Sequence, residues 1–194
     1  MGPDEGKGWK SARACALAMS AAAVGLAPIG AGRAAAEVIS AAANGFEVRE
    51  TAHIAAPPDK VYAALLLPAR WWSSQHTFSG DAANLVLEPR AGGCWCETLP
   101  NGGSVEHLHV VYVAPGKALR LRGALGPFQA MAVEGAMTWS LAAAADGTDI
   151  TMAYTIVGYG KDGFGELAKA ADRVLGEASQ SLKKLVEGAP PAPR

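Results

Sequence analysis

A run of basic residues is missing from this sequence. The 194 residues include 17 Lys and Arg against 18 Asp and Glu, so the formal net charge is −1. Because nucleic-acid binding rests on a basic surface that meets the phosphates, the chain has no electrostatic footprint for that partner. Charged residues are also few, at 18%, whereas hydrophobic residues make up 50% of the chain. That balance excludes an intrinsically disordered protein and favours a globular one with a real core.

Familiar catalytic motifs are missing as well. The sequence holds no Gly-x-Ser-x-Gly elbow, no phosphate-binding loop and no dinucleotide-binding glycine motif. Glycines are frequent over 158–165, but there they suit a turn between a strand and a helix. No internal repeat and no second domain are visible. The sequence therefore assigns no catalytic residue, no metal ligand and no cofactor, and it leaves open whether the protein is an enzyme.

The first 36 residues do not look like part of the fold. A basic start precedes an uncharged, alanine-rich stretch over 14–31, and three alanines then stand before Glu37. This order predicts a secretory signal peptide over 1–36, whose removal leaves a periplasmic or secreted protein. A membrane anchor is one alternative, but the stretch is mostly Ala, Gly and Ser, so no stable membrane insertion is expected after cleavage. A wrongly assigned start or a cytosolic tail is the other alternative.

One domain is expected between two irregular ends. Residues 37–45 look like a flexible lead, and 188–194, which contain three prolines, look like a disordered tail. The domain itself is placed at 46–187. Near its start, two short helical segments are expected after the first strand, at Asp59–Leu67 and Ala69–Ser74.

Alternating apolar residues predict a series of short strands and one long helix at the end. The strands are expected at Phe46–Ile54, Leu85–Glu88, Gly93–Leu99, Val105–Val113, Ala118–Arg122, Val133–Leu141 and Thr148–Ile156. The dipeptide Asn101-Gly102 is the strongest short signal for a hairpin, and it joins the third strand to the fourth. Apolar residues spaced three and four apart over Phe164–Val186 predict an amphipathic helix. Such a helix needs a large apolar partner, and a curved antiparallel sheet is the only one available.

Four local motifs occur in an order that is specific for one fold. They are the segment Ala55–Tyr62 with its Pro-x-x-x-Val pattern, the pair Trp71-Trp72, the strand opening Gly92–Glu97, and the turn Val113–Leu119 with its Val-x-Pro-x-x-x-Leu pattern. Together they resemble the START-like superfamily, also called SRPBCC, over about residues 46–186. The resemblance implies an α+β helix-grip fold, as in the major birch-pollen allergen, in which a curved antiparallel sheet grips one long C-terminal helix. Members include carriers, hormone receptors, polyketide cyclases, dioxygenase subunits and chaperone activators, so the fold alone does not name an activity.

A cavity between the sheet and the helix is the expected site. Aromatic side chains can line it or simply fill the core, and the candidates are Trp71, Trp72, Trp95, Phe128, Trp139, Tyr154 and Phe164. His76 lies on a loop that could close the cavity mouth, although a lone loop histidine is more often a surface residue. A small hydrophobic or aromatic molecule is the expected partner.

Alternation along the hairpin over 93–113 assigns its side chains to two faces. The face expected to meet the helix carries Trp95, Glu97, Glu106, Leu108, Val110 and Tyr112. The segment Leu99–Leu108 is similar to the gate-loop hairpin of the plant abscisic-acid receptors, in which the counterpart of Glu106 lines the cavity. Buried carboxylates there would have raised pKa values and would serve as ligand anchors or general acids, whereas carboxylates at the rim would be solvated.

The opposite face of the same hairpin is expected to hold two cysteines and two histidines. Cys94 and Cys96 share it with His107 and His109, a set that suits zinc, although the spacing is not a standard zinc signature. In an oxidising compartment the cysteines could instead form a disulfide. Ordinary surface packing is the third interpretation.

Three functions from different classes follow from these patterns. The first is an exported START-like domain that carries or senses a small hydrophobic or aromatic ligand. The second is an enzyme of the cyclase, aromatase or hydrolase kind that uses Glu97, Glu106 or His76 for acid–base work. The third is an interaction module that resembles the heat-shock ATPase activators. The ligand and the oligomeric state stay open.

Overall fold

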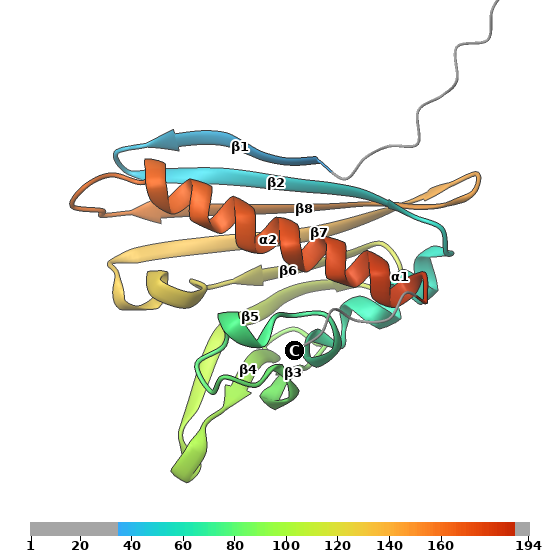
Figure 1. The fold of residues 1–194 in the computed structure, drawn as a ribbon, viewed down its shortest axis with the longest axis horizontal. Helices are drawn as coiled ribbons and strands as arrows, with labels where there is room; N and C mark the ends of the chain where they lie inside the picture. Colours follow the sequence, from blue (N-terminus) through green and yellow to red (C-terminus); the bar gives the residue numbers. More distant parts are fainter. Residues whose placement is uncertain (1–34, 189–194) are drawn as a thin grey trace, which may run out of the picture. The chain divides into compact units, whose positions relative to one another are not determined.

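An eight-stranded antiparallel sheet is the framework of the fold (Figure 1). The computed structural model describes residues 35–188, and within them the strands follow the spatial order β1-β2-β8-β7-β6-β5-β4-β3. Their bounds are β1 Ala35–Ala42, β2 Gly45–Ile54, β3 Leu85–Leu87, β4 Cys94–Thr98, β5 Ser104–Ala114, β6 Ala118–Arg122, β7 Val133–Ala144 and β8 Gly147–Gly158. Every neighbouring pair is antiparallel.

Within residues 35–188, two α-helices and five 3-10 turns complete the fold. The helices are α1 (Pro58–Leu65) and the long α2 (Gly165–Val186), which crosses one face of the sheet (Figure 1). The 3-10 turns are η1 Pro68–Arg70, η2 Ser74–His76, η3 Ala82–Asn84, η4 Pro100–Gly102 and η5 Gly126–Ala130. The expected α+β helix-grip fold is confirmed, because a curved antiparallel sheet holds one long C-terminal helix.

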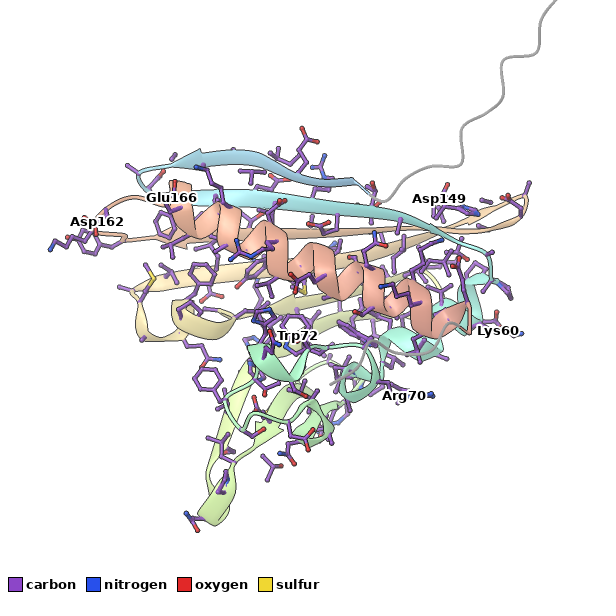
Figure 2. All side chains as sticks on the ribbon, in the orientation of Figure 1. Lys60, Arg70, Trp72, Asp149, Asp162 and Glu166 are labelled. Atoms are coloured by element: carbon purple, nitrogen blue, oxygen red, sulfur yellow. A yellow bond between two sulfur atoms is a disulfide. The ribbon has the colours of Figure 1, made fainter. Side chains whose placement is uncertain are left out.

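The core lies between α2 and the concave face of the sheet. The helix buries a stripe that includes Ala168, Leu175 and Leu182, and each fully buried leucine contributes roughly 2 kcal/mol. At the start of the helix, the ring of Phe164 packs at 6.1 Å from the ring of Phe46 on β2. Figure 2 shows Trp72 between the helix and the lower strands, whereas the other labelled side chains, all charged, lie at the periphery.

The segment expected to be a flexible lead, 37–45, is instead an edge strand and its turn. β1 pairs with β2 from Ala35↔Thr51 to Ala42↔Gly45, with an irregularity between Val38 and Ser40. Alanine and serine have little intrinsic preference for strands, so pairing with β2 and packing under α2 decide the conformation of this segment. Residues 1–34 and 189–194, which hold most of the expected signal peptide and tail, lie outside the described residues. Among residues 35–188, no helix is both long and apolar enough to cross a membrane.

A buried carboxyl group lies under α2, on the concave face of β2. The Glu50 side chain is only 3% exposed, and its Oε1 atom has no hydrogen-bond partner. Asp172 on α2 also has an unpartnered buried oxygen. Burial, and then the nearby charge of Asp172, raise the pKa of Glu50 from 4.5 to about 8. Burial, and then the charge of Glu37 on β1, raise the pKa of Asp172. Glu50 is therefore mostly protonated in the folded protein at neutral pH.

This raised pKa predicts that stability falls as pH rises. Between the unfolded pKa of 4.5 and the folded pKa of about 8, the unfolded chain loses the Glu50 proton while the folded chain keeps it. That difference costs the folded state on the order of 5 kcal/mol across the window, and below pH 4.5 the cost disappears. In Glu50→Gln, urea unfolding between pH 4.5 and 8 should show a much flatter profile. Glu47→Gln, on the opposite face of β2, should keep the wild-type slope. Equal slopes in Glu50→Gln and wild type would contradict the assignment.

Candidate functional site

A cavity of about 650 Å³ lies against the first half of α2. Three segments wall it, namely the helix over 167–175, the loop over 72–78 that contains η2, and the loop over 125–130 that contains η5. Two side chains reach it from the sheet, His107 from β5 and Tyr154 from β8. The walls are mostly apolar, and the residues that carry them are Trp72, Phe78, Leu125, Pro127, Phe128, Leu167, Ala171, Val174 and Leu175.

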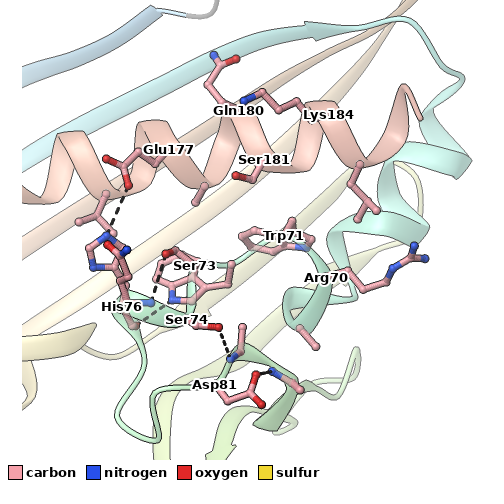
Figure 3. Close-up of a pocket in the computed structure, with 18 residues that line it drawn as sticks. Arg70, Trp71, Ser73, Ser74, His76, Asp81, Glu177, Gln180, Ser181 and Lys184 are labelled. Carbon is pink, nitrogen blue, oxygen red and sulfur yellow. Dashed lines mark hydrogen bonds and ion pairs between the residues drawn. The ribbon is translucent and has the colours of Figure 1, made fainter. Parts of the chain in front are cut away.

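A second, more polar hollow of about 850 Å³ lies along the other half of α2 (Figure 3). Its lining includes the charged residues Arg70, Asp81, Glu177 and Lys184. The two hollows share Trp72, Gln75, His76 and Val174, so the η2 loop stands between them. His76 Nε2 lies 3.6 Å from Glu177 on α2, and Figure 3 shows this contact joining the loop to the helix. The apolar hollow is the better candidate for a hydrophobic ligand because its walls lack these charged groups.

A buried Glu–His pair lies beside the apolar cavity. Glu97 Oε2 is 2.9 Å from His107 Nε2, and the two side chains are 0% and 5% exposed. Burial would raise the pKa of Glu97, but hydrogen bonds from Ser79, Phe78 and His107 outweigh it and lower that pKa. Burial lowers the pKa of His107 despite the opposing effect of Glu97. At neutral pH the pair is thus a carboxylate beside a neutral imidazole.

These charge states settle the tautomer of His107. A carboxylate can only accept hydrogen bonds, so the facing Nε2 atom carries the imidazole proton and donates it to Glu97. The Nδ1 atom is then a bare acceptor, and among residues 35–188 the structure records no hydrogen-bond donor to it. Because His107 lines the cavity, Nδ1 is the natural acceptor for a hydroxyl group or an acidic proton of a ligand.

Both loops that wall the cavity are tied to the sheet by buried polar groups. The Glu97 carboxylate accepts the backbone N–H of Phe78 at 3.0 Å and that of Ser79, which fixes the loop after η2. The Tyr154 hydroxyl accepts the backbone N–H of Leu125 at 2.9 Å, which fixes the loop before η5. Burial raises the pKa of Tyr154, so this hydroxyl stays protonated.

Two irregularities in β5 decide which side chains face the cavity. The register jumps from Trp95↔Leu108 to Cys96↔Glu106, so His107 is an extra residue on β5, which is a β-bulge. His107 and Leu108 are therefore both buried, and Glu106 turns outward with a side chain that is 58% exposed. A second shift between Val110 and Tyr112 leaves Tyr112 exposed.

Three of the expected orientations are thus wrong. Glu106 and Tyr112 do not face the helix, and His107 does not lie on the outer face. A strict two-residue alternation, which the bulges interrupt, was the source of these errors. His107, which reaches the cavity from β5, was therefore missed as a site residue, whereas His76, which also lines the cavity, was identified. Three successive long side chains, Glu106-His107-Leu108, give no sequence signal by which a bulge can be recognised.

The other candidate residues divide between the hollows and the core. Trp72, His76, Phe128 and Tyr154 line the apolar cavity, and Trp71 lines the polar hollow together with Trp72 and His76. Glu97 holds the cavity histidine and the loop. The remaining candidates are fully or almost fully buried and line neither hollow, and they are Trp95, Leu108, Trp139 and Phe164. Trp95 still contributes indirectly, because its ring packs edge-on against Trp72 at 5.2 Å.

Removal of the Glu97 carboxylate should destabilise the protein strongly. In Glu97→Ala, His107 and the N–H groups of Phe78 and Ser79 all lose a buried acceptor, so we expect a loss of roughly 3 kcal/mol or more in the free energy of unfolding. Glu106→Ala, on the neighbouring strand but exposed, should change it by about 0.5 kcal/mol or less. Urea titration measures both. Similar losses in the two variants would show that Glu97 does not anchor the loop.

Comparison with known proteins identifies a family and several solved structures to which this chain is similar. The family model described as polyketide cyclase / dehydrase and lipid transport matches residues 45–187. No curated protein matches the chain significantly in sequence. Among solved structures, protein MLL2253 from Mesorhizobium loti is 20% identical with a TM-score of 0.55, covering 74% of this chain and 98% of its own. A protein from Rhizobium leguminosarum is 19% identical with a TM-score of 0.56, covering 77% and 99%.

One similar structure carries a descriptive name. The di-domain ARO/CYC StfQ from the steffimycin biosynthetic pathway is 18% identical with a TM-score of 0.50. The match covers 75% of this chain and 50% of StfQ. At these identities the similarity to solved structures shows the fold alone.

Proposed function

Because the chain belongs to the polyketide cyclase / dehydrase and lipid transport family, we propose that it binds a small hydrophobic or aromatic molecule in the apolar cavity under α2. The observation that carries this proposal is a hollow of about 650 Å³ with mostly apolar walls and one buried polar pair beside it. Pockets for small organic ligands usually have this composition, in which apolar walls supply affinity and a few polar groups fix orientation.

The chemistry of the walls indicates how such a ligand is held. The rings of Trp72, Phe78 and Phe128 offer flat apolar surface, and burial of a ligand against them yields about 25 cal/mol per Å² of apolar area. His107 Nδ1 accepts a hydrogen bond, so a ligand with a hydroxyl group near one end is favoured over a pure hydrocarbon. The sequence of residues 1–36, in which a basic start is followed by an apolar stretch and three alanines, is typical of a secretory signal peptide. This pattern supports a carrier or sensor role outside the cytoplasm, where the protein binds and releases such molecules.

A bulky side chain in the cavity wall should block binding. Ala170 on α2 lines the cavity, whereas its neighbour Lys169 is exposed. In Ala170→Phe, the neutral fluorescent probe N-phenyl-1-naphthylamine should bind at least tenfold more weakly than in wild type, because the new ring occupies the cavity. Lys169→Phe should bind the probe as wild type does. Equal affinities in the two variants would place the apolar site elsewhere. As a separate measurement, native mass spectrometry of the purified wild-type protein would identify any molecule that copurifies with it.

The Glu–His pair also supports a second candidate function, an enzyme of the cyclase or aromatase kind. A neutral imidazole that is oriented by a carboxylate and has a bare nitrogen is a general base. In such a reaction Nδ1 takes a proton from a carbon beside a ligand carbonyl. The resulting enolate carbon then attacks a second carbonyl of the same molecule, and the protonated imidazole returns the proton to the new alkoxide. The reaction needs no cofactor.

The variant His107→Gln distinguishes the carrier from the enzyme. If His107 is the base, turnover of a poly-ketone substrate should fall by about 100-fold or more, while affinity for N-phenyl-1-naphthylamine changes little. Turnover in the wild type should decrease in acid through a pKa below 6.5, because protonation of His107 removes the base and its pKa is lowered. A carrier would show no turnover in either protein. An unchanged rate in His107→Gln would exclude the catalytic role.

A further inference from the structure

A second group of reactive side chains lies on the outer face of the β4–β5 hairpin, away from the cavity. Cys94 and Cys96 form a disulfide there, with their Cα atoms 5.3 Å apart. The two sulfur atoms and a carboxylate oxygen of Glu106 lie within 4.8 Å of one another. His109 is the cross-strand partner of Cys94, and its Nδ1 atom is 3.2 Å from Glu106 Oε1.

The β-bulge brings the last two of these residues to one face. In a regular strand, residues three apart point to opposite faces, so Glu106 and His109 could not both contact the cysteines. The extra residue, His107, turns inward to the cavity and leaves Glu106 opposite Cys96 and His109 opposite Cys94. Cys94 and Cys96, two apart on a regular strand, share the outer face without such help. Three potential ligands, Cys94, Cys96 and Glu106, therefore lie together across two paired strands, and His109 lies beside them in contact with Glu106.

The chemistry of the four groups suits a borderline divalent metal ion. Thiolate, imidazole and carboxylate are the protein ligands of zinc, which prefers four of them in a tetrahedral arrangement. The sulfur atoms of a disulfide are not available as thiolates, so the oxidised pair cannot bind zinc in this way. All four side chains are at least partly exposed, so an ion can reach them from solvent.

We propose that reduction of the Cys94–Cys96 disulfide opens a zinc site formed by Cys94, Cys96, Glu106 and His109. A low-molecular-weight thiol supplies the two electrons, and two of its molecules become one disulfide while Cys94 and Cys96 become thiols. Zinc then binds as the two thiols release their protons to solvent. The two cysteines of the hairpin are thus linked in either of two ways, by a disulfide under oxidising conditions or through a bound zinc ion under reducing conditions.

The test uses the full chain with Cys15→Ser, so that Cys94 and Cys96 are its only cysteines. Co²⁺ serves as the spectroscopic probe for zinc. After reduction with a phosphine, one equivalent of Co²⁺ per chain should produce thiolate-to-cobalt charge-transfer absorption and the visible bands of tetrahedral cobalt, and Zn²⁺ should displace it. The oxidised protein should show neither absorption. Equal Co²⁺ spectra for the oxidised and reduced proteins would overturn the proposal.

Variants then test the two ligands that the bulge contributes. Glu106→Gln and His109→Ala should each weaken Zn²⁺ binding to the reduced protein by at least tenfold, measured by competition with a chromophoric chelator. His53→Ala is the matched control, because His53 is another partly exposed strand histidine that contacts carboxylates, and it should bind Zn²⁺ as the parent does. Circular dichroism checks that each variant is folded. Unchanged affinity in both Glu106→Gln and His109→Ala would show that the cysteines bind metal alone, which contradicts the four-ligand site.

Discussion

One helix cannot cover an eight-stranded sheet. A helix with its side chains is about 10 Å wide and strands lie about 4.8 Å apart, so α2 shields roughly two strands. Its backbone approaches the sheet most closely along β2 and β1, at one edge. The apolar faces of the remaining strands need another cover, which α1 and the loops over 66–84 and 125–130 supply. The cavity lies where the helix and these two loops meet, so it is a direct consequence of the mismatch in width.

Loops are poor covers unless something holds them, and here polar groups do so. Glu97 and Tyr154 project from the sheet and bind backbone N–H groups of the two loops. A buried carboxylate costs desolvation energy, and three donors converging on Glu97 offset that cost. The same carboxylate orients His107, so the group that fixes the loop over 72–78 also sets the hydrogen-bonding character of this imidazole in the cavity wall. Glu97 therefore contributes both to holding the loop and to orienting the histidine in the cavity wall.

The fold was largely predictable because its signals are local. The three-and-four spacing over Phe164–Val186 and the alternation over Ala118–Arg122 both correspond to the observed elements within one residue. The edge strand β1 was not predictable, since its alanine-rich sequence has no strand pattern and only pairing with β2 creates it. The site was half predictable. Trp72, His76 and Glu97 were identified from their positions, whereas His107 and Glu106 exchanged faces because of one inserted residue. A bulge depends on how two strands fit together, and a single strand's sequence does not record that fit.

The short strand β4 carries residues of both the buried Glu97–His107 pair and the exposed Cys94–Cys96 disulfide. Its side chains alternate, so Trp95 and Glu97 face the core while Cys94 and Cys96 face outward. β4 is held on both sides, by β3 and by β5. The bulge in β5 produces the same separation of faces on the neighbouring strand. It turns His107 towards the core and leaves Glu106 and His109 on the outer face with the cysteines. The sheet thus separates the apolar cavity from a solvent-exposed face that carries the disulfide, and residues adjacent in the sequence lie on opposite sides of it.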